Sequence, residues 1–141
     1  MTYPPLVYYQ DKNEYRKHFE REYCKNPIIT FDGLKVRFNK RDFEHAFYES
    51  INTKDDSFSI KRAQRINWIK TALQDPESER YFGWNKNRRK IDRKRRVTIV
   101  MKEYVVVIGI NKKRTTGWFI TAFIADSGRT LKMIRESPKY K

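Results

Sequence analysis

The chain has 141 residues, which is enough for one domain with a hydrophobic core. Its 32 Lys and Arg residues outnumber its 17 Asp and Glu residues, so the formal net charge is +15 at pH 7. Because this charge repels itself in a compact chain, it indicates a polyanionic partner: nucleic acid first, an anionic membrane surface second, and an acidic inhibitor protein alongside either. Aromatic residues make up 15% of the chain, which argues against a disordered protein.

Other features exclude further classes of protein. The single cysteine, Cys24, rules out an internal disulfide, and no apolar run approaches the length of a membrane span. The N-terminal sequence has no basic stretch followed by an apolar one, so no signal peptide is evident. The expected site of action is the cytoplasm, and an origin as a fragment excised from a larger delivered or phage-encoded protein is compatible with it.

The first 38 residues predict an arm, a helix and a hairpin. Residues 1–10 contain two prolines and are expected to form an extended arm. Residues 11–25 predict an amphipathic helix, capped by Asp11, with an aromatic residue at every fourth position. These aromatic residues are Tyr15, Phe19 and Tyr23. Ile28–Phe31 and Leu34–Phe38 flank Asp32-Gly33, a strong signal for a two-residue hairpin turn.

Two more helices are expected before the strands begin. The first covers Arg41–Ser50, with Asn39 as its N-cap, and leaves His45 opposite its packing face. The second and stronger helix covers Ser59–Gln74 and is ended by Asp75-Pro76. The residues expected to pack in the core are Phe43, Ala46 and Phe47 in the first helix and Ile66, Ile69 and Leu73 in the second.

The C-terminal half predicts a meander of strands. The strands are expected at Val97–Met101, Tyr104–Ile110 and Gly117–Ala125, with Tyr81–Trp84 as a further short strand or an ordered loop. A short helix over 126–136 and a tail over 137–141 follow. Helices followed by strands predict a single α+β domain over residues 1–141, with N-terminal helices packed on a roughly four-stranded antiparallel sheet.

Alternation along these strands predicts which side chains share a face. In the first strand Val97, Ile99 and Met101 point one way, and Arg96 and Thr98 point the other. In the last strand Trp118, Ile120, Ala122 and Ile124 are expected to pack on the helices. Arg96 and Thr121 would then open onto a common outer face.

A dense basic segment, Lys86–Arg96, leads into the first long strand and contains one acid, Asp92. It is expected to be a loop that binds phosphate, and the plain alternative is a solvated, mobile loop. The substrate-binding residues expected here are Lys86, Arg88, Arg89, Lys90, Arg93, Lys94 and Arg95. Tyr81 and Trp84 stand next to it, where they can stack on unpaired bases or simply anchor the loop to the core.

Metal-dependent chemistry has little support, because the chain has two His, one Cys and no recognisable ligand spacing. No metal or other cofactor is expected.

RNA can be cut without a metal if a base takes the proton of the 2′-hydroxyl, an acid protonates the leaving oxygen and cations stabilise the phosphorane-like transition state. Histidine suits both proton roles, and His45 is the better candidate because His18 lies in a charged helix and is expected at the surface. A solvent-facing or carboxylate-paired His45 is an equally weighted alternative.

Six short motifs resemble nuclease domains associated with phages and toxins, in the barnase–EndoU–colicin–RelE-like (BECR) superfamily. These motifs are RDFEHAFYES, RAQRINWIKTALQDP, YFGWNK, RRVTIV, EYVVVIGI and GWFITAFIAD. The resemblance covers residues 40–138. It implies helices packed on a four-stranded antiparallel sheet and metal-independent cleavage of RNA that leaves a 2′,3′-cyclic phosphate.

The same resemblance implies the catalytic residues: the helix histidine His45, the arginines Arg65 and Arg96, and the hydroxyl of Thr121. Phe123 stands where relatives often have tyrosine, so no phenol role is expected there. Arg62, at the end of the same helical stripe, is expected to bind substrate.

The resulting hypothesis is a toxin-type, metal-independent endoribonuclease that acts on tRNA or other structured RNA, with an acidic immunity or antitoxin protein as a second partner. A non-catalytic RNA- or ribosome-binding module is the alternative, and a metal-dependent DNA nuclease is the third reading.

Overall fold

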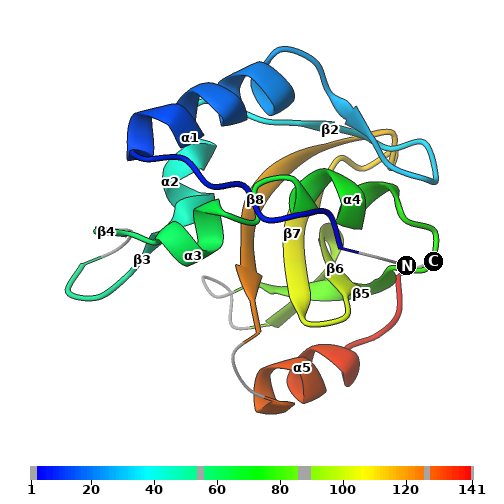
Figure 1. The fold of residues 1–141 in the computed structure, drawn as a ribbon. Coiled ribbons are helices and arrows are strands. Elements are labelled where there is room, and N and C mark those ends of the chain that lie inside the picture. Colours follow the sequence, from blue (N-terminus) through cyan, green and yellow to red (C-terminus); the bar gives the residue numbers. More distant parts are fainter. Residues whose placement is uncertain (1–2, 54–55, 86–89, 126–127, 141) are drawn as a thin grey trace.

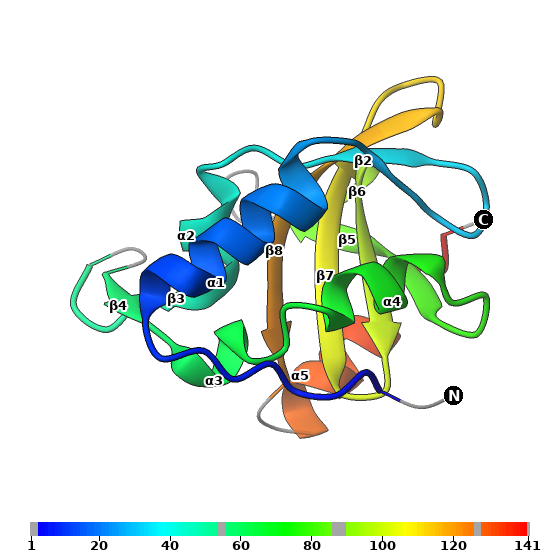
Figure 2. The same ribbon diagram turned by 45° about the horizontal axis from the view of Figure 1, so that its top comes forward.

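The computed structural model describes residues 3–53, 56–85, 90–125 and 128–140, with the backbone alone for residues 84, 85 and 90–95. The fold is α+β, as the sequence predicts, with most helices on one side of a central sheet (Figures 1 and 2). The sheet has six strands in the order β1-β2-β8-β7-β6-β5. The strands are β1 (Ile28–Ile29), β2 (Lys35–Arg37), β5 (Glu79–Asn85), β6 (Lys90–Met101), β7 (Tyr104–Ile110) and β8 (Thr116–Ile124).

The prediction of four antiparallel strands describes β5 to β8, and the hairpin strands β1 and β2 were predicted but not as part of this sheet. The N-terminal hairpin joins the sheet because β2 pairs in parallel with the first residues of β8. Its turn is longer than two residues: the Thr30 amide donates to the Leu34 carbonyl at 2.9 Å, so three residues form the loop. Gly33 adopts φ +91° there, a conformation that favours glycine.

The predicted helices form, but each is modified. Asp11 caps α1 (Lys12–Phe19) as expected, and the helix continues as a π-helical turn over Glu20–Cys24. The second helix, α2 (Asp42–Phe47), ends early where the chain becomes the strand β3 (Tyr48–Glu49), which pairs with β4 (Ser57–Phe58). Its N-cap is Arg41 and not Asn39: the Asn39 amide donates to the Asp42 carboxylate, and the Asn39 carbonyl accepts from the Asp42 amide. The predicted helix over residues 59–74 is interrupted and forms α3 (Ile60–Ala63) and α4 (Trp68–Gln74).

The helix-covered face of the sheet holds the main hydrophobic core. Phe19 lies at its centre and contacts aromatic rings from the π-helical turn, the residue after β2, α2 and β8: Tyr23, Phe38, Phe43, Phe47 and Phe119. Figure 2 shows α1 and α4 in front of the strands. The first helix and the hairpin therefore share one core with the rest of the chain.

The opposite face carries a smaller core under α5 (Gly128–Arg135), which lies at the bottom of Figure 1. Leu131 and Ile134 of α5 pack against Val100 and Val105 of the sheet. The rest of this face is called the outer face below. No helix within the described residues is long and apolar enough to cross a membrane.

A β-bulge in β8 changes the predicted alternation of faces. Val107 pairs with Thr121 and Ile108 with Phe119, so Ile120 is an extra residue without a partner on β7. Phe119 therefore packs in the main core, whereas Trp118 points to the outer face, and the prediction for these two residues was wrong. Thr121 lies beyond the bulge, so it still points to the outer face, as predicted.

The sequence predicted a tail over residues 137–141, but the described part of this segment is bound to the sheet. The Phe82 amide donates to the Pro138 carbonyl at 2.8 Å, and the Tyr140 amide donates to the Arg80 carbonyl at 3.1 Å. The segment thus lies along the edge of β5 and satisfies backbone groups that an edge strand would otherwise expose.

Candidate nucleic-acid interface

The outer face is open at the end of the sheet away from α5. One cross-strand row there, called the open row below, consists of Arg37, Trp118, Gly109 and Arg96, from β2, β8, β7 and β6 in order. The next row contains Thr98, Val107 and Thr121. Arg96 and Thr121 therefore share this face, as predicted, one row and two strands apart. From the spacing of strands their Cα atoms are about 12 Å from each other, so a bound phosphate would have to lie between them.

His45 lies beside this face because α2 flanks the edge of β8. The Thr121 hydroxyl donates to the His45 backbone carbonyl at 2.6 Å. This bond ties the two predicted catalytic residues together, although they are 76 positions apart in the sequence. It also engages the hydroxyl proton, so Thr121 must exchange this acceptor before it can donate to a phosphate oxygen.

Asp42 stands one turn before His45 on α2. Burial raises the pKa of the Asp42 carboxyl, while the hydrogen bond from the Asn39 amide and the nearby His45 act in the opposite direction. The carboxylate holds the start of α2 through the Asn39 amide at 2.8 Å. Asp42 thereby fixes the helix that carries His45.

Arg62 and Arg65 do not join this face. The Arg62 guanidinium donates to the Tyr48 carbonyl at 3.0 Å and lies 3.7 Å from a Glu49 carboxylate oxygen. The Arg65 guanidinium lies over the Trp68 ring, 5.0 Å from its centroid, on the helix-covered side of the sheet. The Arg62 and Arg65 guanidinium groups donate to the backbone carbonyls of Tyr48 and Lys61, whereas Arg96 lies in the middle of β6.

The other predicted contacts fall in three groups. Tyr81 is 5% exposed and its hydroxyl donates to Glu79, so its ring packs in the core under α5 and offers no stacking surface. Lys86, Arg88 and Arg89 lie outside the described residues. Trp84 and residues 90–95 lie in β5 and β6, so this half of the basic segment is strand and not loop.

His18 is buried and not at the surface as predicted, because its ring bonds to two neighbours. Its Nδ1 is 2.8 Å from the Tyr9 hydroxyl and its Nε2 is 2.9 Å from Asn67 Oδ1. These bonds join the N-terminal arm, α1 and the start of α4. His18 is a structural residue, remote from the open row.

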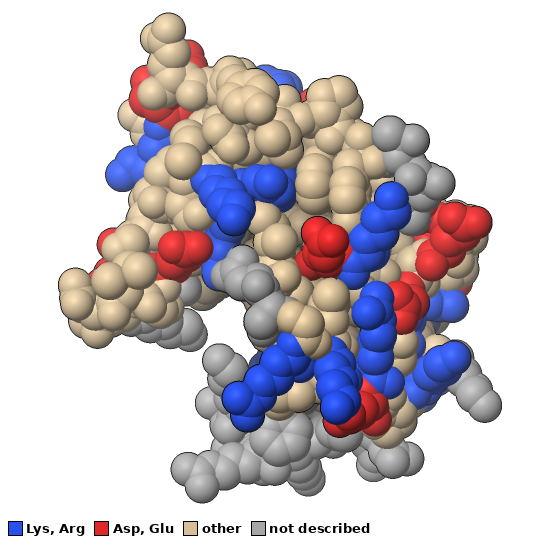
Figure 3. Space-filling view, turned by 60° about the horizontal axis from the view of Figure 1, so that its bottom comes forward, with Lys and Arg blue, Asp and Glu red and all other residues tan. Residues whose placement is uncertain are grey.

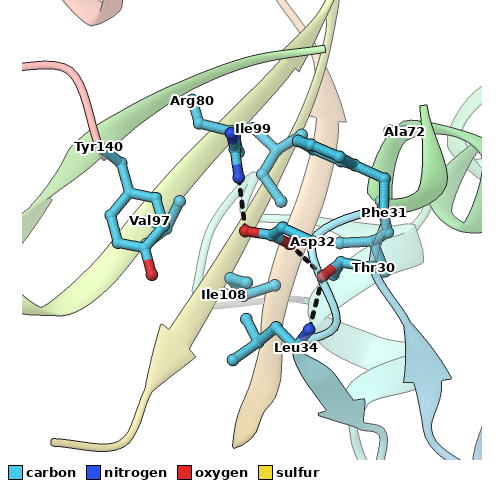
Figure 4. A pocket seen from close by; sticks show the side chains of 11 residues that line it. Thr30, Phe31, Asp32, Leu34, Ala72, Arg80, Val97, Ile99, Ile108 and Tyr140 are labelled. Carbon is cyan, nitrogen blue, oxygen red and sulfur yellow. Dashed lines mark hydrogen bonds and ion pairs between the residues drawn. The ribbon is translucent and has the colours of Figure 1, made fainter. Parts of the chain in front are cut away.

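No three or more His, Cys, Asp or Glu side chains within the described residues converge on a point where a metal ion could be held. A cavity under the β1–β2 loop is lined by Phe31, Arg80, Tyr140 and apolar core residues (Figure 4). Its free volume of about 10 Å³ has room for no more than one water molecule. This cavity is therefore too small to hold a nucleotide.

Figure 3 shows the molecule from the side on which α5 lies. Lys and Arg side chains are spread over this view, and the surface is hollowed between two lobes. Asp and Glu side chains lie among them in the same view, and the net charge of +15 makes the chain as a whole attractive to a polyanion.

Cys24 is a free thiol that makes no part of this surface. Burial raises its pKa to about 11, with smaller contributions from the nearby carboxylates of Glu20 and Asp42. Because the thiolate is the reactive form, native Cys24 should react with a disulfide reagent at pH 8 about 100-fold more slowly than in the chain unfolded by guanidinium. Equal rates in the two states would contradict this burial.

The fold and the open row define an α+β protein with a candidate nucleic-acid interface on one sheet face. Comparisons of the chain with protein-family models, curated proteins and solved structures find no match.

The sequence prediction did not include Trp118 and Arg37, which the structure places on the outer face beside Arg96. One signal was present: Gly109 interrupts an otherwise apolar strand, and glycine inside a strand often marks the close approach of another group.

Proposed function

We propose that this protein binds RNA on the outer face and cleaves it without a metal ion. The observation that carries the proposal is the cross-strand row that places Arg96 and Trp118 on an open face, next to the Thr121–His45 pair. Arginine binds phosphate through two parallel hydrogen bonds, and an aromatic ring can stack on a base. This chemistry agrees with the resemblance to BECR ribonucleases.

In the proposed reaction His45 takes the proton of a ribose 2′-hydroxyl. The 2′-oxygen then forms a bond to the adjacent phosphorus while the bond from phosphorus to the 5′-oxygen breaks. Water supplies the proton for the leaving 5′-oxygen, and Arg96 stabilises the added charge on the phosphate. The products are a 2′,3′-cyclic phosphate and a free 5′-hydroxyl.

The test is incubation of the purified protein with total RNA in excess EDTA. Discrete fragments with cyclic phosphate ends would support the proposal, whereas cleavage only after addition of Mg²⁺ would point to the metal-dependent reading. Intact RNA in both conditions, together with measurable RNA binding, would leave the non-catalytic RNA-binding module. One observation favours that second candidate: the Thr121 proton is already held by the His45 carbonyl.

The basic segment should govern the salt dependence of binding. Changing Arg93, Lys94 and Arg95 to Gln should lower the slope of log K against log salt by about 2 for single-stranded RNA, since each lost phosphate contact contributes about 0.7. A control variant with Lys12, Lys61 and Lys70 changed to Gln alters the charge equally on the helix-covered side, and its slope should stay close to that of the wild type. An unchanged slope in the first variant would remove the segment from the interface.

A further inference from the structure

The open row places an aromatic ring between two cations. Arg37 and Arg96 are the outer members of the row, and Trp118 and Gly109 lie between them. Because neighbouring strands are about 4.8 Å apart, the two arginines are about 14 Å from each other across the sheet. Trp118 is 41% exposed, which is high for a tryptophan in the middle of a strand pair.

The missing side chain of Gly109 leaves room for the Trp118 indole above the sheet. A Cβ atom at position 109 would stand 2.1 Å from Cε2 and 2.3 Å from Cζ2 of the indole, closer than real atoms approach. The indole therefore occupies the space above Gly109, and 41% of the Trp118 surface remains exposed to solvent. Glycine weakens the interior of a strand and often marks the close approach of another group. Here that group is the Trp118 indole, which occupies the space of the missing side chain.

We propose that Trp118 is a stacking platform for an unpaired RNA base, and that Arg37 and Arg96 bind the phosphates on either side of that base. The inference rests on the proposed function and names its substrate class, single-stranded RNA. Every base has a face that can stack on an indole, so the platform tolerates any sequence. In a duplex the base faces are covered by their neighbours, so the platform favours loops and single strands.

The test measures binding of a labelled single-stranded oligoribonucleotide, a duplex of equal length and inorganic polyphosphate. Trp118→Leu should weaken binding of the single strand about 5- to 150-fold, the range found for loss of one stacked base. Its affinity for the duplex and for polyphosphate should stay near that of the wild type. Tyr8→Leu is the matched control, because Tyr8 is an exposed aromatic residue in the N-terminal arm, away from the row.

Two more variants separate stacking from a merely structural role. Trp118→Phe keeps an aromatic face, so it should retain most of the affinity yet lose the part of the tryptophan fluorescence that RNA quenches in the wild type. Gly109→Ala adds a Cβ that displaces the indole while both arginines remain, so it should weaken single-strand binding in the same direction as Trp118→Leu.

The outcomes distinguish this inference from the proposed function. If the wild type binds no RNA, both are overturned. If the wild type binds and cleaves RNA but Trp118→Leu binds as Tyr8→Leu does, the platform alone is overturned. An equal loss of affinity for polyphosphate would also overturn it, because that polymer has no base to stack.

Discussion

Replacing His45 by alanine should slow RNA cleavage in EDTA by about 10²- to 10⁴-fold, the usual contribution of one general acid or base. RNA affinity should change little, because the phosphate and base contacts proposed above belong to Arg37, Arg96 and Trp118. The measurement is single-turnover cleavage of a labelled RNA, with binding followed in parallel. Cleavage by His45→Ala at the wild-type rate would remove His45 from the mechanism.

The chain supplies a matched control in its second histidine. His18 is buried between Tyr9 and Asn67, so His18→Gln should lower the stability of the protein without entering the reaction. At a temperature where this variant is fully folded, its cleavage rate should equal that of the wild type. A loss of rate in both variants would indicate that the fold, and not a proton transfer at His45, limits activity.

Replacing Phe19 by alanine should lower the free energy of unfolding by about 3–5 kcal/mol, the range for a phenylalanine deleted from a packed core. Phe19 is fully buried and its ring centroid lies 5.4–5.9 Å from those of Tyr23, Phe38, Phe43 and Phe47. These rings come from different parts of the chain and cannot all move to fill the cavity. Chemical denaturation, read by circular dichroism, gives the value.

Phe31→Ala is the control for this loss of stability. Phe31 is an exposed phenylalanine in the β1–β2 loop, and its ring contacts the guanidinium of Arg80 at 4.3 Å from the centroid. Removing it loses little buried area, so the loss should stay below about 1 kcal/mol. Equal losses for the two variants would show that Phe19 is not the centre of the core.

The proposed platform explains why the bulge in β8 matters for function. In a regular strand Trp118 and Thr121, three positions apart, would point to opposite faces, because side chains alternate along a strand. The bulge brings both residues to the outer face, where Arg96 also lies. Bulges often redirect side chains beside functional sites in this way.

The sequence by itself determined the features that depend on local pattern and composition. Aromatic residues at every fourth position placed Tyr15, Phe19 and Tyr23 in the core. Alternation along β6 placed Arg96 and Thr98 on one face, and the Asp32-Gly33 pair marked a hairpin. Each of these depends on residues that are neighbours in the chain.

Only the tertiary structure decided which distant groups meet. The exposed position of Trp118 depends on a bulge that forms when β8 pairs with β7, and the neighbourhood of Arg37 depends on a parallel contact between segments 80 residues apart. The break between α3 and α4, the burial of His18 and the bond from Thr121 to the His45 carbonyl likewise follow from packing. Such contacts leave no periodic signal, because the partner that produces them lies elsewhere in the sequence.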